Sequence, residues 1–568
     1  MILVLDHGED ATPSPELQGR FRLWRVRAYA ALIGLVLLTS CGGGTAVSSG
    51  LPVTAVANAD PSRFPTLSVA GGYYDWTTFA FDAARTGYAS PETTLDLRNV
   101  DALRLKWTYR LPDVVTSQPV LAGNVSTAQG PVSMLYVGSH DGTFVALNAD
   151  TGSLVWQRRL HAASYYCGGT ESYGVDRSAT FERSTNRVYV DDGHDLIHAL
   201  DMSTGKEDAG WPVSAGGVPG LDSPHGGLNL VQNTLYATTA SSCDISPWHG
   251  RVAALDTRAA ALEHTFFTVP KSSGGGVWGQ GGASVDPLNG NVFLAVGNAD
   301  TTIDGNAQNA GYGEHIVELT QNLAFIAANF PGVPPYSLLP GSQPQGPDGD
   351  LDFGATPVLF SGPDGSACAA AVNKSGLLVL YNRSNVAGGY TQYILMNPPT
   401  DDADFVGLPA YAAGLLYVPL PDDFASGAER YHHGLAALHV LAGCRADPTP
   451  VWNAVFGLLP SQTTADDEHS PPTVANGVVY EADGPNNTVY ALNAMTGALL
   501  WTSAGKTNQA LYTPPLVDRN LYLTSYEGTV YAFGLPWKPF AGSAASPPPP
   551  VGRRPPLRWS LRMHLLGS

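Results

Sequence analysis

Four residues suited to cofactor chemistry lie in short loops between predicted strands: Trp278, Asn298, Asp352 and Lys374. An indole offers a flat, polarisable face on which a planar cofactor can stack. An amide oxygen is a ligand that hard divalent cations accept. A carboxylate can take the proton of a hydroxyl group, and a lysine adds positive charge for nearby oxygens. These residue types together could bind a small molecule or an ion.

A wider set of polar residues falls on loops that we expect at the same end of the fold. It comprises Glu171, Asp222, His225, Trp278, Asn298, Asp352, Lys374, Asp467, Glu468 and His469. A ring of short loops with carboxylates, a tryptophan and a lysine could bind a small molecule or an ion. The alternative is that loops are simply polar, so that single members of the set have no function.

The loops are positioned by a repeated pattern of strand, turn, strand, Thr-Gly and Trp. One copy runs from Leu135 to Trp156, another from Val479 to Trp501, and weaker copies lie between them. Periods of about 40 to 50 residues with several short strands each are typical of a β-propeller. The pattern therefore predicts an all-β fold of four-stranded antiparallel blades.

Eight strand units can be counted along the chain. They begin near Ser117, Val175, Gly227, Gly282, Asp352, Val406, Ser470 and Leu511. The last unit ends near Phe533 and lacks an outer strand, whereas residues 103–109 form a strand before the first unit. Pairing these two would close an eight-bladed ring and remove two exposed sheet edges. Trp107, Trp156, Trp211, Trp452 and Trp501 are expected to pack between blades.

Four cysteines lie within the predicted ring: Cys167, Cys243, Cys368 and Cys444. Each blade should have four strands, A to D, with the D–A and B–C connections at one face of the ring and the A–B and C–D connections at the other. Cys167 and Cys243 fall on a D–A and a B–C connection, and Cys368 and Cys444 fall at the opposite face. Disulfides Cys167–Cys243 and Cys368–Cys444 are therefore expected, because crossed pairs would exceed the span of roughly 4.4–6.8 Å between Cα atoms. Four free thiols are the alternative.

The repeats and the loop motifs resemble the pyrroloquinoline quinone (PQQ) dehydrogenases, nearest the polyvinyl-alcohol-dehydrogenase-like branch. The resemblance covers residues 103–537 and implies PQQ and Ca²⁺ as cofactors. By motif, Trp278 would be the floor under the quinone and Asn298 a Ca²⁺ ligand. Asp352 would be the general base, and Lys374 would contact the quinone oxygens.

The sequence also departs from that family. It has no adjacent cysteine pair, since Cys167 stands alone, and Lys374 replaces an arginine that many relatives carry. Glu171 and Asp192 are the candidates for the acidic Ca²⁺ ligand. No C-x-x-C-H motif is present, so we expect no haem and a separate electron acceptor.

The ends of the chain predict export. Residues 1–40 combine four arginines, a short apolar stretch and Leu-Thr-Ser before Cys41, which resembles the lipobox of bacterial lipoproteins. Cys41 would then carry a lipid, residues 41–70 would be a flexible tether, 71–541 the propeller and 542–568 a disordered Pro/Arg-rich tail. The expected location is the cell envelope, on a membrane through the lipid.

Two functions of different classes fit these observations. The first is a PQQ-dependent oxidoreductase of an alcohol or sugar-like substrate. The second is a non-catalytic scaffold with an envelope protein partner, similar to the propeller lipoprotein of the outer-membrane β-barrel assembly machinery. The formal charge of −19 disfavours nucleic acid as a partner, because an acidic surface repels phosphates.

Overall fold

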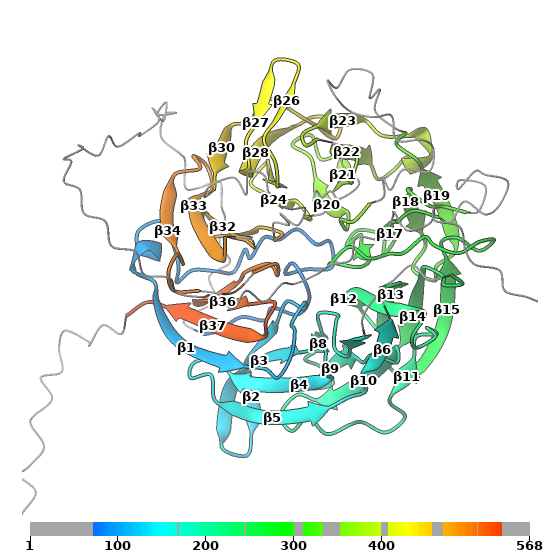
Figure 1. Ribbon diagram of the computed structural model, residues 1–568, viewed down its shortest axis with the longest axis vertical. Coiled ribbons are helices and arrows are strands. Elements are labelled where there is room, and N and C mark those ends of the chain that lie inside the picture. Colours follow the sequence, from blue (N-terminus) through cyan, green and yellow to red (C-terminus); the bar gives the residue numbers. More distant parts are fainter. Residues whose placement is uncertain are drawn as a thin grey trace, which may run out of the picture.

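A computed structural model describes residues 72–166, 170–242, 246–299, 311–332, 353–398, 407–456 and 470–536, apart from 485, 508 and 510. These residues form eight antiparallel sheets around one axis, in chain order (Figure 1). The predicted all-β, eight-bladed propeller is confirmed. Its only described helices are two 3₁₀ turns, η3 (Val100–Ala102) and η6 (Val386–Gly388).

The first four blades follow the chain from the innermost strand outward. They are β2 (Val120–Thr127), β3 (Gly130–Gly138), β4 (Thr143–Asn148) and β5 (Leu154–Arg159); β8 (Thr180–Glu182), β9 (Arg187–Asp191), β10 (Leu196–Asp201) and β11 (Val213–Ser214); β12 (Ser223–Val231), β13 (Thr234–Ala240), β14 (Arg251–Asp256) and β15 (Ala261–Phe267); and β16 (Ser284–Val285), β17 (Val292–Ala295), β18 (Ile316–Leu319) and β19 (Phe325–Asn329).

The other blades follow the same order. They are β20 (Val358–Ser361), β21 (Ala367–Val372), β22 (Leu377–Asn382) and β23 (Gln392–Leu395); β24 (Ala410–Ala412), β25 (Leu415–Leu420), β28 (Gly434–Leu441) and β30 (Trp452–Val455), with β29 (Arg445–Ala446) also on β28; β31 (Thr473–Ala475), β32 (Val478–Asp483), β33 (Thr488–Asn493) and β34 (Leu499–Thr502); and β35 (Leu516–Asp518), β36 (Asn520–Thr524), β37 (Thr529–Gly534) and β1 (Arg104–Arg110). Two further hairpins, β6 (Ala163–Tyr166) with β7 (Thr170–Tyr173) and β26 (Phe424–Ser426) with β27 (Glu429–Tyr431), are insertions.

The ring closes as the sequence predicts. Strand β1 pairs antiparallel with β37, so the outer strand of the eighth blade comes from the beginning of the ring. Trp107 lies on this strand, and its Nε1 donates to the carbonyl of Ala149 in the first blade at 3.1 Å. Closure leaves neither end of the circular array as an open sheet edge.

The Thr-Gly and Trp elements of the repeat fit together between neighbouring blades. A Cβ on Gly152 would lie 2.6 Å from the Trp107 ring, and one on Gly205 would lie 2.6 Å from Trp156. Each indole therefore lies flat on the glycine turn of the next blade, where no side chain could fit. The predicted packing of these tryptophans between blades is confirmed.

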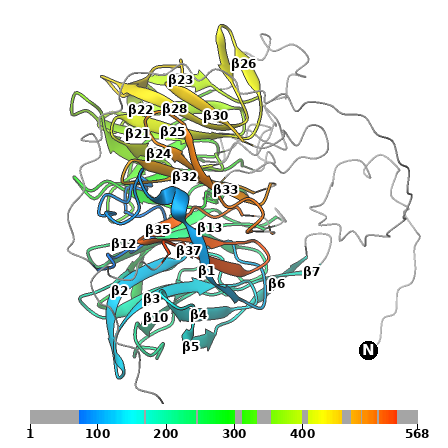
Figure 2. The same ribbon diagram turned by 90° about the vertical axis from the view of Figure 1, so that its left-hand side faces the viewer.

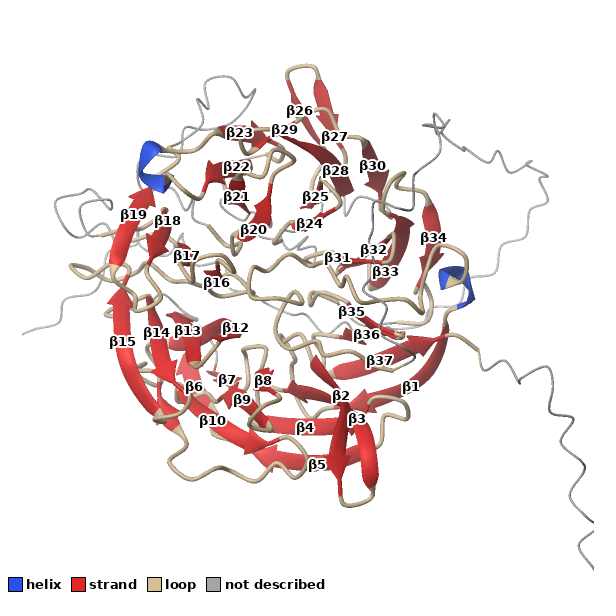
Figure 3. Cartoon of the chain, turned by 180° about the vertical axis from the view of Figure 1, so that it is seen from behind, coloured by secondary structure: helices blue, strands red, loops and turns tan. Residues whose placement is uncertain are grey.

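A segment before the propeller repeats, here called the central strap (residues 73–89), lines the inside of the ring. It contacts the innermost strand of every blade, and the contacts follow chain order: Tyr74 with Val517, Trp76 with Leu121, Thr77 with Phe181, Thr78 with Leu228, Ala83 with Val285, Ala84 with Leu359, Thr86 with Tyr411 and Gly87 with Val474. Figure 3 shows these innermost strands arranged around the axis. Six of the contacts are backbone hydrogen bonds, which pair groups on strand edges that would otherwise face the channel.

One end of the strap meets a buried carboxyl group. The backbone N–H of Tyr74 donates to Asp518 Oδ2 at 3.1 Å, while Asp518 Oδ1 has no hydrogen-bond partner. Burial, together with the neighbouring Glu92 carboxylate, raises the pKa of Asp518 to about 9 from an ordinary value of 3.8. The folded protein therefore keeps a proton that the unfolded chain releases above about pH 4.

Asp518→Asn should stabilise the fold, and the gain should grow from pH 4 to pH 8. The raised pKa means that Asp518 lowers stability progressively over this range, whereas an isosteric amide does not titrate. Thermal melts of the two proteins should agree near pH 4 and differ by a few degrees at pH 8. Glu263→Gln, on the exposed face of β15, is the control. It should leave the melting temperature unchanged at both pH 4 and pH 8. A pH-independent difference for Asp518→Asn would contradict the assignment.

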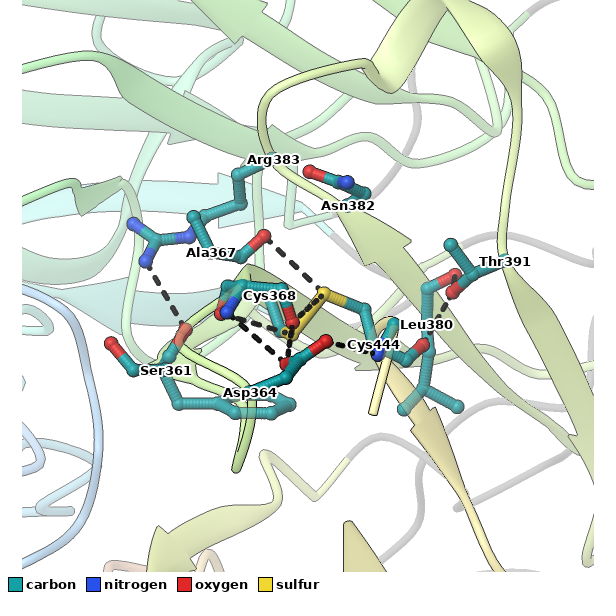
Figure 4. Close-up of a disulfide and its surroundings, with 12 residues drawn as sticks. Ser361, Asp364, Ala367, Cys368, Leu380, Asn382, Arg383, Thr391 and Cys444 are labelled. Carbon is teal, nitrogen blue, oxygen red and sulfur yellow. Dashed lines mark hydrogen bonds between the residues drawn. A yellow bond between two sulfur atoms is a disulfide. The ribbon is translucent and has the colours of Figure 1, made fainter. Parts of the chain in front are cut away.

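One predicted disulfide lies within the described residues and is confirmed. Cys368 at the start of β21 bonds to Cys444 after β28, with 5.2 Å between the Cα atoms (Figure 4). The bond joins the fifth and sixth blades at the predicted face. Cys167 and Cys243 lie outside the described residues, so that pair stays a prediction. No described helix has the length and apolar character needed to cross a membrane.

Candidate functional site

Trp278 and Lys374 lie on loops at one end of the ring, here called the mouth face, where D–A and B–C connections emerge. Trp278 belongs to the connection between β15 and β16, and Lys374 to the turn between β21 and β22. The β6–β7 hairpin is also a D–A insertion, and it projects from the ring in the side view (Figure 2). The loops that carry Trp278 and Lys374 therefore lie at the same face of the ring, as the blade assignment predicts.

Trp278 and Lys374 meet although 96 residues separate them. Lys374 Nζ lies over the Trp278 ring, 5.2 Å from its centroid, which is a cation–π distance. Asn373 holds the lysine turn, because its Oδ1 accepts from Ser375 Oγ at 2.7 Å. Both partners are half-buried, so they remain accessible from the mouth face. Two of the four predicted cofactor residues therefore converge.

Asn298 is held beside the glycines that precede Trp278. Its carbonyl accepts from the N–H of Gly275 at 2.6 Å, and the N–H of Gly297 donates to Gly276 at 2.7 Å. Gly275 has φ +72°, and a Cβ there would lie 2.3 Å from a methyl carbon of Val269. Glycine is required at this close approach, which brings the exposed Asn298 to the loop segment leading into the tryptophan.

Several predicted site residues lie outside the described residues. They are Cys41, Asp352, Asp467, Glu468 and His469; Glu171 pairs through its backbone with Tyr165, but its side chain lies outside the description. The described chain resumes at Phe353, and a Cβ on Gly279 would lie 2.6 Å from the N atom of Thr356. The segment that follows Asp352 thus lies against the turn that carries Trp278.

Two members of the predicted loop set have structural partners. Asp222 is buried, pairs with the Arg251 guanidinium and accepts from the N–H of His249 at 3.1 Å. His225 Nδ1 lies 3.2 Å from Asp176 Oδ2. His225 lies within β12 and not on a loop as predicted, and its partner Asp176 precedes the second blade. The carboxylate of Asp222 is occupied by Arg251 of β14, so its contacts are structural.

Asp176 was missed in the sequence, although it lies between two histidines at this face. His140 Nε2 is 3.0 Å from its Oδ1, and Thr116 Oγ1 donates to the same oxygen at 2.6 Å. Burial opposes the charge, but His225 and His140 outweigh it and hold the pKa of Asp176 well below its usual range. Thr116 and His140 belong to the first blade and His225 to the third, while Asp176 itself precedes the second, so no local spacing could have indicated the cluster.

Asp192, a candidate Ca²⁺ ligand, is instead engaged by histidines. His161 Nδ1 and His198 Nε2 lie 2.6 and 3.1 Å from its Oδ2. Within the described ranges, these three residues are the sole group of three or more His, Cys, Asp or Glu ligand atoms close enough to share a metal.

A polar cavity of about 330 Å³ opens at the face opposite the mouth. Tyr73, Asn124, Asp150 and Arg519 line it, with the Arg519 guanidinium 5.1 Å from the centroid of the Tyr73 ring. Its walls come from the central strap and from A–B and C–D turns. None of the predicted cofactor residues contributes to it.

The pair of Trp278 and Lys374 fits one of the two predicted cofactors. PQQ is a planar quinone with carboxylate groups, and it needs a flat surface and a positive charge. The indole supplies the surface, and the ammonium group of Lys374 lies above it. The described pair of Trp278 and Lys374 thus suits the quinone.

Comparison with protein families identifies two matching regions. Residues 76–223 match the β-propeller domain of glucose, ethanol and alcohol dehydrogenases, and residues 444–535 match the family of the outer membrane protein assembly factor BamB. The chain resembles the PQQ-type β-propellers. Neither match covers half of the chain, and both fall on blades rather than on Trp278 or Lys374.

Individual PQQ-type relatives are distant. A polyvinylalcohol dehydrogenase from a Pseudomonas species is 25% identical over 326 residues, which are 52% of this chain and 47% of the relative. Another, from Sphingopyxis sp. strain 113P3, is 21% identical over 427 residues, 69% of this chain and 61% of the relative. The chain thus spans about half to three-fifths of their lengths.

The solved quinohemoprotein alcohol dehydrogenase of Comamonas testosteroni superposes with a TM-score of 0.60 at 16% identity, covering 83% and 82% of the two chains, which shows a shared fold.

Proposed function

We propose that this protein is a PQQ-dependent oxidoreductase that acts on an alcohol. The observation that carries the proposal is the contact of Lys374 with the Trp278 ring at the mouth face, with Asn298 held beside the same loop. Relatives named as polyvinylalcohol dehydrogenases support an alcohol as the substrate, and a sugar-like alcohol fits the same chemistry. An assembly scaffold would have no need for this constellation.

The chain's own residues would divide the work in a simple way. The Trp278 indole would hold the planar cofactor by stacking, and the Lys374 ammonium would turn from the indole toward oxygens of the bound quinone. Asp352 would accept the proton of the substrate hydroxyl. When bound, PQQ supplies the two-electron oxidising power that no protein side chain has. A separate electron acceptor would then reoxidise the cofactor.

Calorimetric titration with PQQ, with and without Ca²⁺, tests the proposal. Trp278→Ala should weaken PQQ binding by more than tenfold, because it removes the stacking surface. Lys374→Ala should weaken it several-fold through the loss of charge. Lys506→Ala is a matched control, because Lys506 Nζ lies 5.1 Å from the Trp501 ring on an outer strand. No PQQ uptake, or equal affinity in all four proteins, would contradict the proposal.

The scaffold remains the second candidate, because residues 444–535 match the BamB family. For that function we propose three features together: a lipid at Cys41, a position on an envelope membrane and a protein partner. It predicts a stable complex with an envelope protein that survives Trp278→Ala and Lys374→Ala. The enzyme predicts that these variants lose PQQ binding, so the same two proteins separate the candidates.

A further inference from the structure

Two histidines and an aspartate from neighbouring blades point at one position on the mouth face. His161 follows β5, Asp192 follows β9, and His198 lies within β10. Their ligand atoms lie within 4.8 Å of one another, and both imidazoles direct a nitrogen at Asp192 Oδ2. Two imidazole nitrogens and one carboxylate oxygen therefore converge, and this is a donor set that zinc and related divalent transition metals accept once the nitrogens have lost their protons.

Outer contacts orient two of the three groups. His198 Nδ1 lies 2.7 Å from Glu207 Oε2, so this carboxylate fixes the ring and turns Nε2 toward the common position. Asp192 Oδ1 accepts from the N–H groups of His194 and Leu196 at 2.9 and 3.1 Å, which leaves Oδ2 for the histidines. A carboxylate behind a ligating histidine is the usual support of a metal site.

The cluster is built but remains open to solvent. The side chains of Asp192 and His198 are 0% and 6% exposed, whereas that of His161 is 56% exposed. Tetrahedral zinc with bonds of about 2.0–2.1 Å would place ligand atoms about 3.3 Å apart, close to the 3.1 Å of His198 and Asp192. The exposed His161 ring can withdraw the remaining fraction of an ångström from its present 2.6 Å.

We propose that His161, Asp192 and His198 bind a divalent transition metal such as Zn²⁺, with water or His194 as the fourth ligand. Binding would replace the protons that the two imidazoles share with Asp192 by three bonds to the metal and release those protons to solvent. The ring of His194 is already stacked on that of His161, with 4.8 Å between centroids.

The site would clamp the first blade to the second. His161 belongs to the connection that leaves the first blade, and the two other ligands belong to the second. The N–H of Gly193 donates to the carbonyl of His161 at 3.0 Å, and a Cβ on Gly193 would lie 1.9 Å from the carbonyl oxygen of Tyr173. The clamp thus lies directly against the base of the β6–β7 hairpin. It does not depend on PQQ binding.

Titration of chelator-treated full-length protein with ZnCl₂ tests the site, with Co²⁺ as a spectroscopic probe. We expect one equivalent of Zn²⁺ to bind and Co²⁺ to give the visible absorbance of a nitrogen- and oxygen-ligated ion. His161→Ala, an exposed substitution, should weaken Zn²⁺ binding by more than tenfold and abolish that absorbance. Glu207→Gln should weaken binding about 10–100-fold by releasing the His198 ring.

His432→Ala is the matched control, because His432 is similarly exposed and lies 3.4 Å from a single carboxylate, that of Asp423. It should bind Zn²⁺ like the unaltered protein. Equal Zn²⁺ affinity in the unaltered protein and His161→Ala, or no binding at all, would overturn the proposal. The cluster would then be a hydrogen-bonded ion pair that only holds the blades together.

Discussion

Asp352→Asn should lower the turnover of the PQQ-loaded protein with an alcohol by a factor of about 10² to 10⁴. This is the usual contribution of a positioned general base, and an amide cannot accept the proton of the substrate hydroxyl. PQQ affinity should change little, because stacking on Trp278 and the charge of Lys374 remain. Dye-coupled alcohol oxidation, together with PQQ titration of the same samples, measures both quantities.

Asp350→Asn is the matched control, since it removes a carboxylate two residues earlier in the same stretch. It should retain most of the turnover. Equal losses in both variants would show that the stretch acts through its overall charge rather than through one base. Full turnover in Asp352→Asn would remove Asp352 from the mechanism while leaving the PQQ site at Trp278 to be judged by the binding experiment.

Arg85→Ala should destabilise the fold by about 3–5 kcal/mol, a large effect for one residue. Arg85 is fully buried in the central strap. Its Nη1 donates to Thr78 Oγ1 and the Phe79 carbonyl at 2.7 and 2.9 Å, and its Nη2 donates to the Gly227 carbonyl at 3.0 Å. Truncation would leave these acceptors unpaired and open a cavity at the centre of the ring.

Denaturant unfolding of Arg85→Ala against Arg183→Ala measures this effect. Arg183 also contacts the strap, where its Nε donates to Asp75 Oδ2 at 2.8 Å, but this ion pair is partly exposed. Its removal should cost less than about 1 kcal/mol, as for surface pairs. Similar losses in the two variants would show that the strap is held by its backbone hydrogen bonds and not by Arg85.

The contacts of Arg85 within the strap compensate for the burial of its charge. Desolvation lowers the pKa of Arg85 to about 9, and the Asp82 carboxylate opposes the shift. The guanidinium group therefore still carries its charge at neutral pH, and backbone carbonyls surround it. The Arg85 side chain joins two parts of the strap to the third blade. It therefore fixes the position of the strap, whose remaining residues run along the innermost strands.

Much of the fold could be predicted from the sequence because a propeller is built from local repeats. Each blade is a meander of neighbouring strands, so the spacing of Val-Tyr, Ala-Leu-Asn and Thr-Gly motifs reports directly on it. The unpaired strand around Trp107 and the incomplete last unit revealed the closure, since an open edge is costly. The pair Cys368–Cys444 followed from the same assignment of loops to faces.

The candidate site could be predicted from the sequence only in part. Trp278 and Lys374 come together as their loops predicted, because blade topology alone places both at the mouth face. Asp222 shows the limit of this reasoning. The position of a residue on a loop indicates the face of the ring on which it lies. Only the folded structure shows that the Asp222 carboxylate forms an ion pair with the Arg251 guanidinium.

The sequence by itself therefore determined the architecture, the number of blades, the ring closure and the face on which Trp278 and Lys374 lie. Only the tertiary structure decided that residues 73–89 line the channel, and that His161, Asp192 and His198 share one position. The physical reason is that these contacts join segments from different blades, each with its own local pattern. The strap has no repeat of its own, and its backbone bonds depend on the spacing of eight innermost strands that exist only once the ring has closed.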